Sequence, residues 1–389
     1  MKNGYKQTEI GFIPEDWNCA AAKYLMRIET GSRNTEHKTD AGKYPFFVRS
    51  QKIEHIDTYH YDCEAVLTAG DGVGTGKVFH HYIGKFDAHQ RVYVMSDFKG
   101  ITGRFFYNYF SENFGNEVSK YTAKSSVDSV RRDMIAEMLI PTPPIPEQER
   151  IAEALSDVDS MISSLEKLIA KKKAVKQGAM QELLTGKKRL PGFTGEWYET
   201  TIGEHCCVFD GTHQTPKYTL AGIPFYSVEN VTANDFVNTK FITTEEHEQL
   251  SSKCKIEKGD ILMTRIGSIG DCKYIDWDVN ASFYVSLALI KCKETINAQF
   301  LGFYSTSSYF KKEIEIRSLL TAIPQKINLG PISEIRLNIP SDIKEQEAIA
   351  SILSDMDNEI EALEQKLEKT RQVKQGMMQQ LLTGKIRLV

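Results

Sequence analysis

The chain contains the same long segment twice. Residues 147–190 align with residues 345–388 without a gap, and 26 of the 44 pairs are identical. The clearest stretches are "VKQGAMQELLTGKKRL" from Val175 and "VKQGMMQQLLTGKIRL" from Val373. Because unrelated segments would not agree over this length, the chain is a tandem duplication. Its fold must therefore accommodate two copies of one plan.

The duplicated segments are predicted to be long helices. In each copy six apolar residues recur with alternating spacings of four and three, the pattern of a coiled-coil seam. The seam residues are Ile151, Leu155, Val158, Ile162, Leu165 and Ile169 in the first copy and Ile349, Leu353, Met356, Ile360, Leu363 and Leu367 in the second. An acidic "EQE" stretch favours each helix start, and Gly186 or Gly384 favours each helix end. An antiparallel pair of helices would bury both seams.

The predicted helices are long enough to act as a spacer. The span from Glu147 to Thr185 is 39 residues, which gives a helix of about 58 Å at 1.5 Å per residue. The seam loses its register near residues 171–173 and 369–371, before the next apolar residues Val175 and Val373. We expect a kink or a change of packing partner there.

The segments between the predicted helices are related more distantly. Trp17 is followed after fourteen positions by Gly31, and Trp197 after fourteen by Gly211; "YPFFVRS" in the first segment parallels "IPFYSVE" in the second. Both segments are rich in glycine, threonine and aromatic residues and contain short apolar runs, which favour β-strands with a few helices. The sequence therefore predicts an α+β protein in which two globules alternate with two long helices.

Composition limits the class of protein more than its partner. The formal net charge is -4, so no overall basic surface points to nucleic acid. No run of about 18 apolar residues could span a membrane, and the first residues lack an apolar signal core, so we expect a cytoplasmic protein. The seven cysteines are scattered, and His205, Cys206 and Cys207 lack further ligands nearby, so neither a disulfide framework nor a metal site is expected.

Two different globules on a rigid spacer suit a ruler-like partner such as duplex DNA. Modules on one face of a duplex lie about 34 Å or a multiple of it apart, and non-identical modules would read an asymmetric, split sequence. The chain resembles the specificity subunit of type I restriction-modification systems along its whole length. The resemblance rests on the lead-ins "IPTPPIPEQERIA" and "LNIPSDIKEQEAIA", on the "LLTGK" after each predicted helix, and on the Trp-to-Gly entry of each globule.

The resemblance implies an architecture and a set of partners. It implies target recognition domains at residues 1–143 and 191–340 and helical spacers at 144–190 and 341–389, paired as an antiparallel coiled coil with a pseudo-twofold. It also implies a non-catalytic subunit that binds double-stranded DNA, two methylation subunits and restriction subunits. S-adenosylmethionine, ATP and Mg would serve those partners in adenine N6 methylation and restriction, with no cofactor in this chain.

The expected DNA contacts are short-range donors on polar loops and strand ends, which can reach bases or phosphates. In the first globule they are Ser32, Arg33, Arg49, Gln51, His89, Gln90, Arg91, Arg131 and Arg132. In the second globule they are His213, Gln214, Thr215, Lys217, Asn230, Arg265, Ser268, Gln325 and Lys326. The stretch "DGTHQTPKY" carries four of them and resembles a stretch found in recognition domains of the family. An ordinary turn, or a surface or core role, is the alternative for each residue.

The slipped seams are expected to expose apolar side chains to partner proteins. Two equivalent surfaces near the helix ends would bind two copies of one partner. The expected partner-binding residues are Met180, Leu183, Leu184, Met378, Leu381 and Leu382.

Two other functions stay open from the sequence. The stretch Gly70–Lys77 looks like a phosphate-binding loop of a nucleotide-dependent enzyme, but Asp71 and Val78 stand where a Walker A loop needs glycine and Ser or Thr. A coiled-coil scaffold that binds only proteins would explain the helices. It would not explain two globules that keep one lead-in and differ in their polar loops.

Overall fold

The computed structural model describes residues 4–122, 129–319 and 321–389. The chain divides into two compact units, of which the first is Met1–Lys167 with Gln365–Val389 and the second is Leu168–Glu364. Each unit combines one globule with adjoining parts of both duplicated segments. The predicted α+β class, with two globules and two long helices, is confirmed. The division into four segments stays a prediction.

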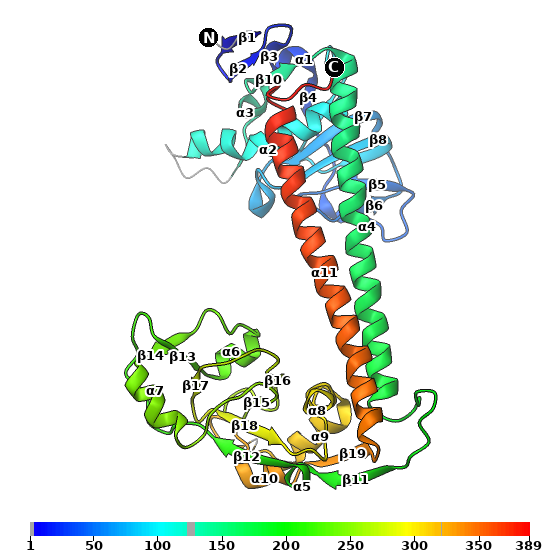
Figure 1. Cartoon of the computed structure of the whole chain (residues 1–389). Helices are drawn as coiled ribbons and strands as arrows, with labels where there is room; N and C mark the ends of the chain where they lie inside the picture. Colours follow the sequence, from blue (N-terminus) through cyan, green and yellow to red (C-terminus); the bar gives the residue numbers. More distant parts are fainter. Residues whose placement is uncertain (1–3, 123–128, 320) are drawn as a thin grey trace. The chain divides into compact units, whose positions relative to one another are not determined.

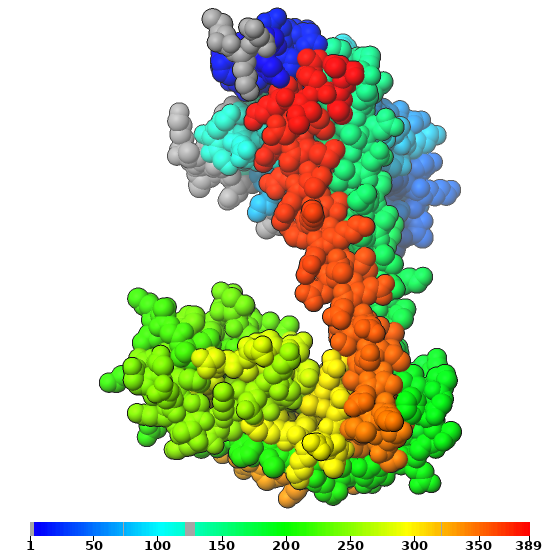
Figure 2. Space-filling view, in the orientation of Figure 1, coloured from blue at the N-terminus to red at the C-terminus, as the bar shows by residue number. Residues whose placement is uncertain are grey.

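The duplicated segments form two uninterrupted helices, α4 (Ile145–Leu183) and α11 (Ile343–Leu381), whose parts lie side by side within each unit (Figure 1). Neither helix breaks where the seam loses its register. Val175 and Val373 are 51% and 50% exposed, so the seam, and not the helix, ends before them. In the space-filling view a face of α11 lies at the surface along the orange-red part of the chain (Figure 2).

The helices pair antiparallel within each unit, as the seam predicts. Of the twelve seam residues, eight are buried and the others are half-buried, namely Val158, Ile162, Met356 and Leu363. Ion pairs flank the seam at equivalent positions of the two repeats. They are Asp159–Lys374 and Glu166–Arg371 in the first unit and Asp357–Lys176 and Glu364–Lys173 in the second. The duplication has thus kept the contacts that fix the register of the pair.

The first globule is built on a six-stranded sheet that helix α2 (Gly103–Thr122) covers. The strand order is β4 (Arg27–Thr30), β9 (Val92–Ser96), β7 (Tyr61–Ala69), β8 (Phe79–Ala88), β5 (Tyr44–Phe47) and β6 (Glu54–Ile56). All neighbours are antiparallel except β5 and β8. The remaining short elements are β1 (Tyr5–Thr8), β2 (Gly11–Pro14), β3 (Asn18–Ala21), α1 (Ala22–Leu25), η1 (Thr35–His37), η2 (Gly72–Gly74), α3 (Arg132–Ala136) and β10 (Leu139–Thr142).

The second globule divides its strands between two main sheets. One has the order β12 (Cys206–Asp210), β18 (Leu287–Cys292), β15 (Ile261–Thr264) and β16 (Cys272–Tyr274); the other has β14 (Lys240–Ile242), β13 (Ile223–Tyr226) and β17 (Ser282–Phe283). The parallel pair β13–β17 corresponds to β5–β8 of the first globule. The other elements are β11 (Trp197–Thr201), α5 (Ile202–His205), α6 (Val228–Ala233), α7 (Thr244–Ser251), α8 (Ala298–Tyr304), α9 (Ser308–Arg317), α10 (Leu329–Ser333) and β19 (Arg336–Pro340).

Both globules are closed at their base by the same strand pair. The entry strand β3 pairs antiparallel with the exit strand β10, and β11 pairs in the same way with β19. Each globule therefore leaves its scaffold and returns to it at one place. Among the described residues, no helix is both long and apolar enough to cross a membrane.

The expected partner-binding residues are mostly buried, so the prediction that they are exposed is wrong. Met378, Leu381 and Leu382 pack in the core of the first unit, and Leu183 and Leu184 pack in the core of the second, all at most 8% exposed. Met180 is half-buried against the second core. The physical reason is that the last turn of each helix lies against the base of a globule, which the spacing within one helix cannot reveal.

Candidate nucleic-acid interface

Two glycines bring corresponding loops against the parallel strand pair in each globule. A Cβ on Gly31 would lie 2.1 Å from the carbonyl oxygen of Ala88, and one on Gly211 would lie 2.3 Å from that of Phe283. Only glycine allows such an approach. Arg33 and His213 follow these glycines by two positions, so they occupy corresponding places in the two globules.

The first globule gathers most of its predicted contacts at one edge of the sheet. Arg33 forms a bridge with His89, and its carbonyl accepts a hydrogen bond from the Gln90 nitrogen at 2.8 Å. The Arg33 Nε donates to Asp87 Oδ2 at 3.0 Å, and the Asp87 side chain is fully buried. Ser32 and Gln90 are exposed beside this pair.

Asp71 joins two further predicted residues. Its Oδ1 accepts a hydrogen bond from Arg49 Nη1 at 2.7 Å, and its Oδ2 accepts one from Arg91 Nη1 at 2.7 Å. Burial raises the pKa of the Asp71 carboxyl, but the hydrogen bonds and charges of the two arginines outweigh it, so the pKa lies below its ordinary value. The carboxylate is therefore ionised at neutral pH. Sequence reasoning treated Asp71 only as a defect in a phosphate loop and missed this role.

His89 supports the site and is not free to read bases. Its side chain is buried, and Nδ1 accepts a hydrogen bond from the Arg91 nitrogen at 3.0 Å. Burial lowers the pKa of His89, and the charges of Arg49 and Arg91 lower it further against the opposing effect of Asp71. The neutral ring holds the backbone of Arg91 in place, because a protonated Nδ1 could not accept that bond.

The remaining candidates of the first globule lie around this edge. Gln51 is exposed, with a long 3.5 Å hydrogen bond from Nε2 to the Phe79 carbonyl. Arg131 and Arg132 are exposed at the start of α3, directly after Val130, whose nitrogen donates to the Gly70 carbonyl at 2.7 Å.

The stretch Gly70–Lys77 is not a phosphate-binding loop. It forms the short turn η2 and leads into strand β8, whereas a phosphate loop leads into a helix whose first nitrogens bind the phosphate. Gly72 and Gly76 have φ of 76° and 65°, which suits a tight turn.

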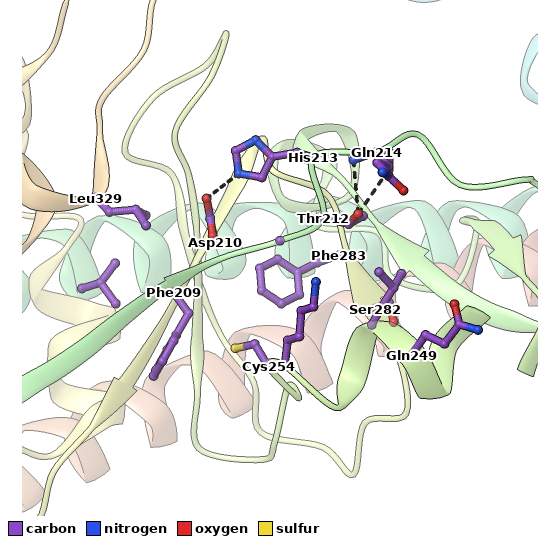
Figure 3. A pocket seen from close by; sticks show the side chains of 14 residues that line it. Phe209, Asp210, Thr212, His213, Gln214, Gln249, Cys254, Ser282, Phe283 and Leu329 are labelled. Atoms are coloured by element: carbon purple, nitrogen blue, oxygen red, sulfur yellow. Dashed lines mark hydrogen bonds and ion pairs between the residues drawn. The ribbon is translucent and has the colours of Figure 1, made fainter. Parts of the chain in front are cut away.

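In the second globule the predicted polar loop is tied to strand β12. Asp210 Oδ2 is 2.7 Å from His213 Nε2 and 3.5 Å from Arg265 Nη1, and Thr215 Oγ1 lies 3.4 Å from the Tyr284 hydroxyl. Figure 3 shows the His213–Asp210 pair and the bonds between Thr212 and Gln214 along the loop. The loop borders a cavity of about 760 Å³. Its remaining side chains, Gln214 and Lys217, are exposed.

Two predicted base readers of the second globule are structural residues instead. Asn230 is 6% exposed, and its Oδ1 accepts a hydrogen bond from the nitrogen of Ser227, the N-cap of helix α6. Its Nδ2 donates to the Asp235 and Asn238 carbonyls. Arg265 is 8% exposed and donates from Nε to the Ile327 carbonyl at 3.3 Å. Asn230 lies in helix α6 shortly after β13, and Arg265 directly follows β15, but their side chains turn inward to satisfy carbonyl groups that the tertiary fold buries.

The last three candidates of the second globule come together near Arg265. The Gly267 nitrogen donates to the Gln325 carbonyl at 2.9 Å, and Lys326 forms bridges with Ile266 and Leu319. Ser268 is exposed, and its hydroxyl donates to Asp271 Oδ2 at 2.5 Å. The bridge between Ile266 and Lys326 corresponds to the one between Asp71 and Ser129 in the first globule.

The described residues contain no cluster of histidine, cysteine and acidic side chains that could hold a metal ion. The His205 ring is engaged with Thr200 and Thr295, at 3.0 and 2.8 Å. Cys206 Sγ faces Cys292 Sγ at 3.5 Å across neighbouring strands, while Cys207 is exposed.

Comparisons with known proteins agree with the repeated architecture. Residues 14–177 and 196–371 each match the type I restriction modification DNA specificity domain. The MjaVIII specificity subunit of a type I restriction enzyme from Methanocaldococcus jannaschii is 27% identical over 97% of this chain and 94% of its own length. The EcoDI specificity subunit of Escherichia coli is 28% identical over 48% of this chain and 41% of its own length.

Solved structures share the fold. The S subunit of a type I restriction-modification system from M. genitalium matches with a TM-score of 0.65 and 18% identity, over 98% of this chain and 99% of its own. A chain from a structure of the assembly of a type I system matches with a TM-score of 0.57 and 15% identity, over 96% and 99%. The duplicated helices, the repeated globules and the two domain matches therefore lead to one conclusion: the chain belongs to the type I restriction-modification DNA specificity family, and it carries two specificity domains.

Proposed function

We propose that this chain gives a type I restriction-modification complex its sequence specificity by reading a split, asymmetric duplex. The first globule would read one half-site and the second globule the other. The observation that carries the proposal is that one scaffold presents different polar groups at corresponding places. Arg33, Arg49 and Arg91 gather in the first globule, whereas His213 and Lys217 lie on the corresponding loop of the second. Two related readers with different chemistry suit two different half-sites.

The chemistry of the complex would reside in other subunits. We propose that methylation subunits use S-adenosylmethionine to methylate adenine N6 and that restriction subunits use ATP and Mg. This chain would contribute the choice of sequence and no cofactor. Those subunits would also supply the positive charge that a chain with a formal net charge of -4 lacks for DNA binding.

Two equivalent helix surfaces support docking of two copies of one partner. Val175 and Val373 occupy the same position of the two repeats and are about half exposed. One turn further, Gly178 and Gly376 are exposed, and a Cβ on either would meet no described atom within 4 Å. Glycine within a helix costs about 0.5–1 kcal/mol relative to alanine. Because nothing in the described chain requires that cost, close approach of a partner explains both glycines.

Selection of bound duplexes from a random library tests the proposal. The chain is purified with its methylation subunits, and the bound DNA is sequenced. We expect one motif with two specified halves separated by unspecified base pairs. A folded complex that selects no motif would favour the protein-only scaffold instead.

A further inference from the structure

Asp71 lies between two arginines that come from separate strand ends. Arg49 follows β5, and Arg91 precedes β9. The Asp71 side chain is 16% exposed, whereas the arginine side chains are 45% and 60% exposed. A largely buried carboxylate thus holds two guanidinium groups at the surface. We call Arg49, Asp71 and Arg91 the arginine fork.

Each arginine uses only one of its guanidinium nitrogens, Nη1, in this contact. Both bonds to Asp71 come from Nη1, and within residues 4–122, 129–319 and 321–389 the Nε and Nη2 atoms of Arg49 and Arg91 have no hydrogen-bond partner. The free edge presents two parallel N–H donors. Guanine offers two matching acceptors, N7 and O6, in the major groove.

The backbone around the fork is fixed before any ligand binds. Asp71 forms an antiparallel bridge with Ser129, the Gly70 nitrogen donates to the Arg91 carbonyl at 2.8 Å, and His89 Nδ1 holds the Arg91 nitrogen. A Cβ on Gly72 would lie 3.9 Å from Arg49 Nη1, so the turn passes close to that side chain. Such preorganisation reduces the entropy lost when the arginines bind a base.

The net charge of the arginine fork, and its contrast with other arginines of the chain, favour a role of Arg49 and Arg91 in contacting DNA bases. The fork has two positive charges against one negative charge, so it keeps an excess that suits DNA. Arg33 differs, because its partner Asp87 is fully buried and the pair is neutral as a unit. In the second globule the corresponding Arg265 is buried on Asp210 and the Ile327 carbonyl. Glu313 there also pairs with two arginines, but Arg317 is only 16% exposed, so that cluster does not hold two exposed guanidinium groups.

We propose that Asp71 holds Arg49 and Arg91 as readers of guanine at neighbouring base pairs of the half-site recognised by the first globule. The inference rests on the proposed function and adds the base that this site selects. Asp71 is a positioning residue, because it contacts the arginines and not the DNA.

Four variants and the wild type, each purified with the methylation subunits, test the fork by selection from the random library. Arg49→Lys and Arg91→Lys keep the charge but lose the paired donors. Asp71→Asn weakens the anchor. Asp97→Asn is the matched control, since Asp97 forms an exposed ion pair with Arg27 on the same sheet.

We expect guanine at two neighbouring positions of one half-site in the wild type. Each Lys variant should lose preference for guanine at one of these positions by about 5- to 150-fold, the range for one bidentate contact. Asp71→Asn should relax both positions. The other half-site should stay unchanged in every variant, which also shows that the complex is folded, and the control should match the wild type.

Three results would overturn the fork. They are a half-site without guanine, a Lys variant that keeps every base preference, and a uniform loss of affinity with a reduced salt dependence, which is the behaviour of phosphate contacts. A wild type that selects no motif at all would instead reject the proposed function, so the two failures can be told apart.

Discussion

The start of each long helix is tied by a buried carboxylate to an arginine that follows the end of the other helix. Glu147, whose side chain is 1% exposed, accepts hydrogen bonds from Arg387 at 2.7 and 2.8 Å and from Trp17 Nε1 at 2.9 Å. At the equivalent position Glu345 accepts two bonds from Arg189, both at 2.6 Å. A buried charge that loses its partner is strongly destabilising.

Glu147→Gln tests this tie. Burial raises the pKa of Glu147, but hydrogen bonds from Arg387 and Trp17 lower it more, so the folded pKa lies below the ordinary value. The stabilisation is therefore present above the ordinary pKa of about 4.3 and is lost as the pH falls through the folded pKa. We expect Gln to cost about 3 kcal/mol at pH 7 and progressively less below about pH 4.

Urea denaturation of the full chain at pH 7 and below about pH 4 measures the free energy of unfolding of the wild type and the variant. Glu149→Gln is the control, because Glu149 lies on the same helix turn and is exposed. Equal stability of wild type and Glu147→Gln at pH 7 would contradict the account.

Single residues were the hardest part to predict from the sequence. Charged donors on loops at strand ends tend to face ligands, so Arg49, Arg91 and His213, which are exposed, stay predicted DNA contacts. Asn230 and Arg265 fit the same pattern but satisfy buried carbonyls, and no local signal distinguishes the two outcomes. The repeated "EQE" was interpreted only as a helix start, although a glutamate and a glutamine kept in both copies indicated a shared buried contact.

At the scale of elements, the spacing of apolar residues along each helix predicts which face pairs with the other helix, but it does not predict what the other faces contact. The alternation of fours and threes identified the seam that the antiparallel pair buries. It could not identify the last turns as core, because their partners lie outside the helices. Pro14 and Trp197, for example, lie close to Gly384 and Gly186, which follow the two helices.

If the helix glycines lie in a partner interface, replacing them by alanine should stabilise the isolated chain but weaken its binding to the methylation subunit. Gly178→Ala with Gly376→Ala should raise the stability of the isolated chain by about 1–2 kcal/mol in total, since a Cβ meets no described atom. The same double variant should weaken binding of the methylation subunit, because a methyl group would separate the surfaces. Urea denaturation and titration calorimetry measure the two effects.

Ala170→Gly is a suitable control for this prediction, since Ala170 is exposed on α4 before the proposed docking surface. It should destabilise the helix without weakening the partner complex. Unchanged partner affinity in the double Ala variant would exclude Gly178 and Gly376 from the interface.

At the scale of the whole molecule, the duplication determined most of what could be predicted. It required two globules and two equivalent helices, and the two specificity-domain matches agree with it. The divergence of the globules indicated two different readers. Which bases they read depends on side-chain geometry and DNA deformability, which no repeat encodes. The distance between the readers stays a prediction from helix length.

The most direct test of the central claim is an N6-methyladenine map of a methylation-free host that expresses this chain with its methylation subunit. The map is repeated after residues 1–143 are exchanged for another recognition domain. We predict one split motif in which the exchange alters one half and leaves the other half unchanged. A motif that changes in both halves, or no split motif despite a folded complex, would contradict the account of two independent readers on one scaffold.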